Sequence, residues 1–68
     1  MSIPITVNGE SQTALQGQTI LGLLEILKVD PEQVAVELDR RIVRRPQWGD
    51  TVLDPGAQIE IVQFVGGG

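Results

Sequence analysis

The stretch that decides the fold is residues 59–68, which read Ile-Glu-Ile-Val-Gln-Phe-Val-Gly-Gly-Gly. The part before the glycines alternates apolar and polar side chains, the period of a strand with one buried face. Ile59 and Ile61 share one phase and should pack against the core, whereas Val62 and Phe64 share the other and should face outward. The stretch therefore predicts a final strand that leads directly into a glycine tail.

The glycines at the end of this strand have no Cβ, so they form a thin segment that can enter a narrow slot. Residues 65–68, fully extended, reach about 13–14 Å, enough to place a terminal carboxylate in another protein's active site. The alternative interpretation is a frayed end or a degenerate linker. We expect a folded domain over residues 1–65 and a flexible C-terminal glycine tail over residues 66–68.

The opposite end of the chain predicts a hairpin. Ile3, Ile5 and Val7 alternate with polar or small residues, and Asn8-Gly9 suits a type I′ turn, which needs positive φ at both central positions. The return strand is mostly polar and should lie at a sheet edge. Pro4 is compatible with an edge strand or a strand start, because it has no N–H to donate.

One helix follows, and three further extended segments complete the pattern. Thr19 can cap the helix, whose apolar residues fall at helical spacing on one stripe: Ile20, Leu23, Leu24 and Leu27. Gly22 within it should permit close packing on the sheet. The later segments are residues 34–39, a short strand at 42–43 after an Arg40-Arg41 turn, and residues 58–64.

The order strand, strand, helix, strand, short strand, strand predicts a two-layer α+β domain. The helical connection lets the first and last strands pair in parallel at the centre of the sheet. This is the β-grasp, or ubiquitin-like, arrangement: a mixed sheet of four to five strands with one main helix packed across one face.

The length, the net charge and the residue types of the chain exclude several classes of function. A chain of 68 residues forms a single small domain, and without cysteine its core must stabilise it unaided. The net charge of −4 disfavours nucleic acid and is compatible with a basic partner surface. No stretch approaches the roughly 20 apolar residues of a membrane span, and the N-terminus lacks the features of a signal peptide. We expect no membrane association and a cytoplasmic location.

The residues that are missing disfavour catalysis by this chain. It has no histidine, cysteine or tyrosine, so the usual pairs of nucleophile and base cannot be built. We therefore expect no enzyme activity, no catalytic residue, no metal site and no cofactor bound by the chain itself.

Two surface features have competing interpretations. Val62 and Phe64, with Ala35 and Glu37 on the neighbouring strand, form a candidate docking patch, or else cover a sheet edge. Four of the five cationic residues cluster between positions 40 and 45 and would contact an acidic partner or form a solvated turn: Arg40, Arg41, Arg44 and Arg45. Trp48 is either a partner anchor or, more in keeping with a small domain, part of the core.

Several pieces of the chain occur together in a fixed order. They are Val7-Asn8-Gly9; Gly17-Gln18-Thr19-Ile20 with Leu23-Leu24-Glu25; Val34-Ala35-Val36-Glu37 with Ile42-Val43 and Trp48; and Ile59-Glu60-Ile61-Val62 with the glycine end. In this order and spacing the whole chain resembles the ThiS family of sulfur carrier proteins. It departs from the family pattern by a third terminal glycine, Gly66, and by Ala57 after Gly56 in the turn before the last strand.

The resemblance implies a protein that is a substrate. An E1-like adenylating enzyme would use ATP to activate the carboxylate of Gly68, with Gly66 and Gly67 threading through its active site. A sulfur donor such as a cysteine desulfurase would then supply sulfur for a thiocarboxylate. Thiazole synthase would receive that sulfur to form the thiazole moiety of thiamine. The carrier is expected to be a monomer, because it visits several partners.

Two alternatives to this function stay open. One is a sulfur carrier for another pathway, such as molybdopterin synthesis, tRNA thiolation or cysteine synthesis. The other is a ubiquitin-like modifier or a β-grasp interaction module.

Overall fold

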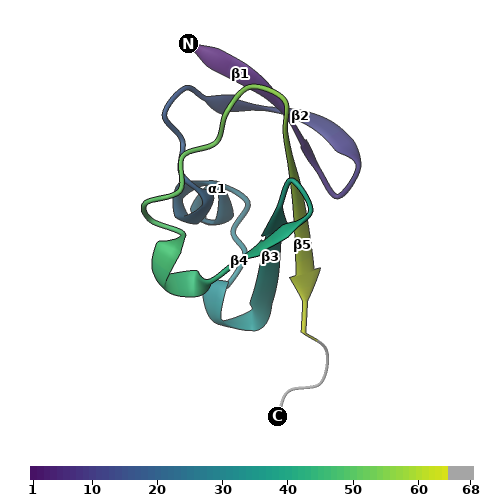
Figure 1. Cartoon of the computed structure of the whole chain (residues 1–68), viewed down its shortest axis with the longest axis vertical. Coiled ribbons are helices and arrows are strands. Elements are labelled where there is room, and N and C mark those ends of the chain that lie inside the picture. The colour runs from purple at the N-terminus through teal and green to yellow at the C-terminus, as the bar shows by residue number, and fades with distance from the viewer. Residues whose placement is uncertain (65–68) are drawn as a thin grey trace.

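The computed structural model describes residues 1–64, so the predicted domain boundary after residue 65 and the glycine tail lie outside the described part. A five-stranded mixed sheet carries one α-helix across one face (Figure 1). The elements are β1 (Ser2–Val7), β2 (Glu10–Leu15), α1 (Ile20–Ile26), the 3-10 helix η1 (Pro31–Gln33), β3 (Val34–Leu38), β4 (Arg41–Val43), the 3-10 helix η2 (Arg45–Gln47) and β5 (Ala57–Gln63). No helix within residues 1–64 has the length and apolar character needed to cross a membrane.

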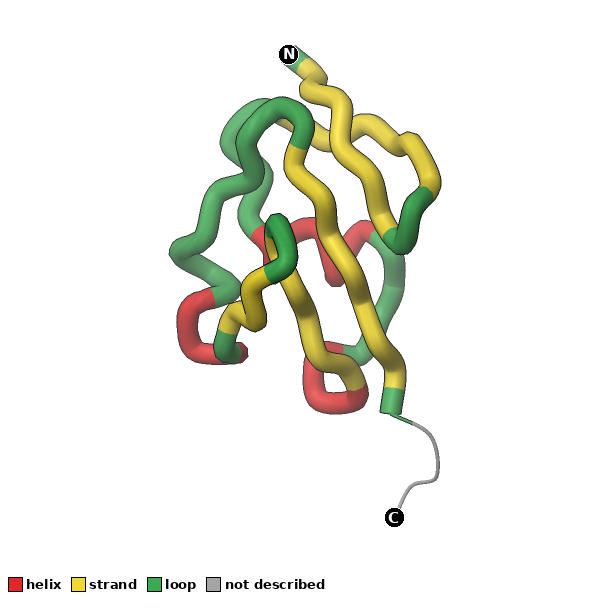
Figure 2. The backbone as a smooth tube through the Cα atoms, turned by 45° about the vertical axis from the view of Figure 1, so that its right-hand side comes forward, coloured by secondary structure: helices red, strands yellow, loops and turns green. Residues whose placement is uncertain are grey.

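The strand order is β2-β1-β5-β3-β4. β1 and β5 pair in parallel at the centre, and every other pairing is antiparallel. Figure 2 shows β5 running between the β1–β2 hairpin on one side and β3 with β4 on the other. The predicted β-grasp fold, with the polar strand β2 at an edge, is confirmed.

Both hairpins turn through residues with positive φ. Asn8 and Gly9 have φ of 52° and 82°, which confirms the predicted type I′ turn. In the second hairpin the positive angles belong to Asp39 and Arg40, at 51° and 71°. The turn therefore lies one residue earlier than the Arg40-Arg41 turn predicted from the sequence, and β4 begins at Arg41.

Pro4 lies in an interior strand, which corrects the expectation of an edge. Its carbonyl accepts a 2.7 Å hydrogen bond from the Gly56 N–H, so its nitrogen lies on the side that faces β5. The parallel pairing begins only at Ile5 opposite Ala57, one residue beyond Pro4. No ladder hydrogen bond is needed at the proline nitrogen, and the strand tolerates it.

The core lies between the sheet and α1, and Trp48 belongs to it. Ile5, Leu24 and Ile59 are almost completely buried there. Trp48 is equally buried, and its Nε1–H donates a 2.7 Å hydrogen bond to the Val43 carbonyl. The indole therefore fills the core and holds the end of β4, and its interpretation as a partner anchor is wrong.

The start of α1 is the one predicted, but Gly22 has another role than the one predicted. The Gly22 N–H donates to Oγ1 of Thr19 at 3.1 Å, which confirms the N-cap. A Cβ on Gly22 would lie 2.7 Å from Nε2 of Gln18, so the glycine leaves room for that side chain and not for the sheet. The helix ends in a Schellman motif with Lys28 at a φ of 59°.

Candidate functional site

The far end of β5, where the chain leaves the sheet, is held on the β1 side by a side chain. The Oδ1 atom of Asn8 accepts the Ile61 N–H at 2.7 Å, and its Nδ2 donates to the Ile61 carbonyl at 3.2 Å. The backbone pairing of β1 with β5 ends at Val7 opposite Ile59. The Asn8 amide thus continues the ladder along β5 after the β1 backbone has turned away.

The same end of β5 is also held on its β3 side. The Phe64 N–H donates a 2.7 Å hydrogen bond to the carbonyl of Gln33. Gln33 ends η1, a turn that Asp30 caps by accepting the Glu32 N–H at 2.9 Å. The strand is therefore hydrogen-bonded as far as Ile61 on its β1 side and as far as Phe64, the last described residue, on its β3 side.

The outward face of β5 carries apolar side chains, as predicted. Val62 is 57% exposed and Phe64 54% exposed, whereas Ile59 is buried and Ile61 partly so. Ala35 lies directly opposite Val62 on β3 and is half-buried. The predicted placement of these side chains is confirmed, and an apolar strip lies on the outer face next to the end of the strand.

An acidic pair lies further along the same face. Glu37 of β3 pairs in register with Glu60 of β5, which places two carboxylates side by side. On the other side of Glu37, Ile42 of β4 occupies the paired position and is 76% exposed. Sequence reasoning missed Ile42 as a surface residue. Only the pairing with β3 places it: Val43 lies opposite the inward Val36, which leaves Ile42 in the outward phase.

The four clustered arginines lie around β4, at the β3–β4 turn and in the loop after β4, and all are exposed: Arg40, Arg41, Arg44 and Arg45. They bracket Ile42 in the sequence. The outer face therefore changes in character from the apolar end of β5, through the acidic pair, to a basic edge at β4.

Among residues 1–64, no group of three or more histidine, cysteine, aspartate or glutamate side chains is arranged to hold a metal ion. Gly66, Gly67 and Gly68, the predicted tail, lie outside the described residues. What the described part offers is an exposed face and a fixed strand end beside it.

The sequence model of the ThiS family matches residues 5–68, almost the whole chain. The chain belongs to the ThiS family. A solved member of the family, the crystal structure of the thiamine biosynthesis protein ThiS from Geobacter metallireducens, superposes with a TM-score of 0.84 at 33% identity. The alignment covers 97% of this chain and 100% of that one.

Two curated relatives of this ThiS family chain differ in length. The sulfur carrier protein ThiS of Escherichia coli K12 is 33% identical over 64 residues, which cover 94% of this chain and 97% of the relative. A thiazole synthase of Magnetococcus marinus is 47% identical over 64 residues, again 94% of this chain. There the chain spans only 20% of the relative's length. The same family domain is thus matched both as a whole protein and as part of a longer one.

Proposed function

We propose that this chain is a sulfur carrier of thiamine biosynthesis, which presents sulfur as a thiocarboxylate on its terminal glycine. The observation that carries the proposal is the family match over residues 5–68, which includes the glycine end. The near full-length match to a relative named sulfur carrier protein supports it. In this role the chain is a substrate of its partners and not a catalyst.

The chemistry would take place at Gly68. An oxygen of its carboxylate attacks the α-phosphorus of ATP in the active site of an E1-like enzyme, pyrophosphate leaves, and an acyl-adenylate forms. The terminal sulfur of a persulfide on a donor such as a cysteine desulfurase then displaces AMP and gives an acyl disulfide. A thiol reductant attacks the donor's cysteine sulfur, forms a disulfide with it, and releases the thiocarboxylate on the carrier. These steps need no side-chain nucleophile from the carrier, in agreement with a sequence that has no cysteine or histidine.

Thiazole synthase is the acceptor that we propose. Support comes from the Magnetococcus marinus relative, a thiazole synthase that contains a matching region within a longer chain. A carrier domain and an enzyme that are joined in one relative are natural partners when they are separate. We place these reactions in the cytoplasm, as the sequence led us to expect.

The docking surface in this proposal is the outer face beside the end of β5. Val62 and Phe64 form its apolar centre, Ala35 fills the neighbouring position, and Glu37 supplies charge. Ile42 extends the same face across β4. Because Asn8 and Gln33 fix the strand end, a partner that binds this face would meet the chain at Phe64 in a defined direction.

The first step is tested by pyrophosphate release. The full chain, ATP and the E1-like enzyme of the same organism should release pyrophosphate in proportion to the carrier added. Deletion of Gly68 should abolish the release, whereas Val52→Ser, a change of an exposed loop residue, should leave it intact. Equal release with and without Gly68 would count against the proposal.

A further inference from the structure

The first strand of the sheet order, β2, has one open side. It pairs with β1 along its whole length, from Val7 opposite Glu10 to Ser2 opposite Leu15, and it is an outermost strand of the sheet. An open strand edge presents unpaired backbone donors and acceptors to whatever approaches it. The pairing of β2 with β1 shows which backbone N–H and C=O groups lie on the open edge.

In an antiparallel pair of strands, the backbone groups of successive residues point alternately toward the partner strand and away from it. The Gln16 N–H donates to the Met1 carbonyl at 2.8 Å, so even-numbered residues of this strand direct their backbone groups toward β1. The N–H and C=O groups of Ser11 and Thr13 therefore point to the open side. The Leu15 carbonyl is already used, because it accepts the Gln18 N–H at 3.0 Å.

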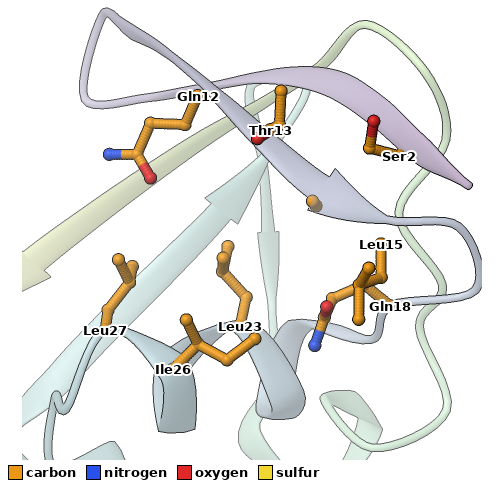
Figure 3. A pocket seen from close by; sticks show the side chains of 9 residues that line it. Ser2, Gln12, Thr13, Leu15, Gln18, Leu23, Ile26 and Leu27 are labelled. Carbon is orange, nitrogen blue, oxygen red and sulfur yellow. The ribbon is translucent and has the colours of Figure 1, made fainter.

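A cleft of about 140 Å³ lies between this edge and α1. Figure 3 shows Leu23 and Ile26 of α1, and Leu27 at its C-terminal end, on the side of the cleft opposite β2, with Gln12 above them. No charged side chain is among the residues that line the cleft, and Ile26 is 61% exposed. A cavity of roughly 150 Å³ holds a molecule the size of benzene, so this space suits one aliphatic or aromatic side chain.

A polar atom in the lining also lacks a partner. Oε1 of Gln18 is buried and accepts no hydrogen bond from any residue in the described part of the chain. Gln18 lines the same cleft. A buried acceptor without a donor is costly.

The opposite edge of the sheet is built differently. β4 has only 3 residues, and exposed arginines flank it on both sides. Short length and charge are the features that keep a sheet edge from pairing with another strand. β2 has 6 residues, of which only Glu10 is charged, so the two edges are not equally protected.

We propose that the β2 edge, with the cleft beneath it, binds an extended, uncharged peptide segment of a partner protein as a sixth strand. Backbone groups of Ser11 and Thr13 would form the ladder, and an apolar side chain of the segment would enter the cleft over Ile26 and Leu27. This surface is separate from the outer face beside the end of β5, so the chain can hold a partner here while its tail is engaged elsewhere.

A second copy of this chain is a poorer occupant. If the β2 strand of a second copy were added to this edge, the side chains that face inward would enter the cleft. In β2 those side chains are Gln12 and Ala14. One is polar and the other is too small to occupy the space. The segment that fits has a larger apolar residue in that phase.

The test is an NMR titration of the ¹⁵N-labelled full chain with the peptide acetyl-Ser-Thr-Val-Thr-Leu-Thr-Val-Ser-amide. We expect saturable shifts confined to the amides of Ser11, Thr13 and Leu15 and to residues of α1. Thr13→Pro removes the backbone N–H that points to the open side and keeps the hydrogen bonds between β2 and β1. The affinity for the peptide should therefore fall about tenfold or more. The matched variant Thr13→Val keeps the N–H and should bind like the parent.

Three results would overturn the proposal. They are no saturable shift on β2 and α1, binding that Thr13→Pro leaves unchanged, and equal binding of a peptide whose leucine is replaced by aspartate. Shifts at β2 that depend on protein concentration without peptide would assign the edge to self-association and would also contradict the proposal. Pyrophosphate release with the E1-like enzyme should be the same for both Thr13 variants, which separates this test from that of the proposed function.

Discussion

Asn8 is bound to Ile61 through both polar atoms of its side chain, at 2.7 and 3.2 Å, across 53 residues of sequence. The same residue has a φ of 52° in the first hairpin turn. One asparagine therefore both allows the chain to reverse and fastens the strand from which the tail leaves. Asparagine suits both roles, because its side chain can hydrogen-bond and it tolerates positive φ.

Two substitutions at Asn8 should separate these roles. Asn8→Gly keeps the backbone conformation and loses both side-chain hydrogen bonds, so the free energy of unfolding should fall by about 1–3 kcal/mol. Asn8→Ala should cost roughly 1–2 kcal/mol more, because alanine resists the left-handed conformation. Urea denaturation measures both values. Equal stability of the parent and Asn8→Gly would show that the two bonds contribute nothing.

Val62 is expected to act in docking and not in stability. Val62→Ser should weaken binding to the E1-like enzyme by about 1–2 kcal/mol, since it removes an apolar side chain from the centre of the proposed face. The melting temperature should change little, because Val62 is already 57% exposed. Val52→Ser is the control, a similarly exposed valine at 51%. Calorimetric titration that finds the same affinity for both variants would refute the docking role.

The acidic pair should favour association at the expense of stability. Glu60→Gln removes the repulsion with Glu37 across the strands, so unfolding should become harder by about 0.2–1 kcal/mol. If the partner surface is basic, the same variant should associate more slowly at low salt, and the difference should shrink as salt is added. Stopped-flow binding with Glu10→Gln as the control checks this. If Glu60→Gln does not change the association rate, the acidic pair has no role in docking.

Gly67 should matter only to the partner. Gly67→Val should keep the stability of the domain, because the change lies beyond Phe64, which follows β5 and is the last described residue with a backbone hydrogen bond. Its side chain should block entry into a narrow active site, so pyrophosphate release should be lost. Gly66→Ala adds a smaller group one residue earlier and should be tolerated better. Unimpaired release by Gly67→Val would contradict threading of the tail.

The sequence predicted the parts of the fold that depend on local chemistry. Asn8-Gly9 specified its turn through positive φ, Thr19 specified the helix start through its cap, and alternation placed Val62 and Phe64 outward. The parallel pairing of the first and last strands followed from the connection between them. Each of these features has a signal within a few residues or in the order of elements.

The features that the sequence did not reveal depend on register or on distant contacts. The turn at Asp39-Arg40, instead of the predicted Arg40-Arg41, changes which residues pair. Only the pairing shows that Ile42 faces outward beside Glu37. Pro4 is tolerated because the parallel ladder begins one residue after it. The bond from Asn8 to Ile61 joins residues whose proximity no local pattern indicates.

The central claim is that Gly68 becomes a thiocarboxylate. It is tested most directly by the intact mass of the chain after incubation with ATP, sulfide and the E1-like enzyme of the same organism. We expect a mass increase equal to the replacement of one oxygen by sulfur, localised to Gly68 and absent when Gly68 is deleted. An unchanged mass while a known carrier reacts in the same assay, or an isopeptide bond to a lysine instead, would contradict it.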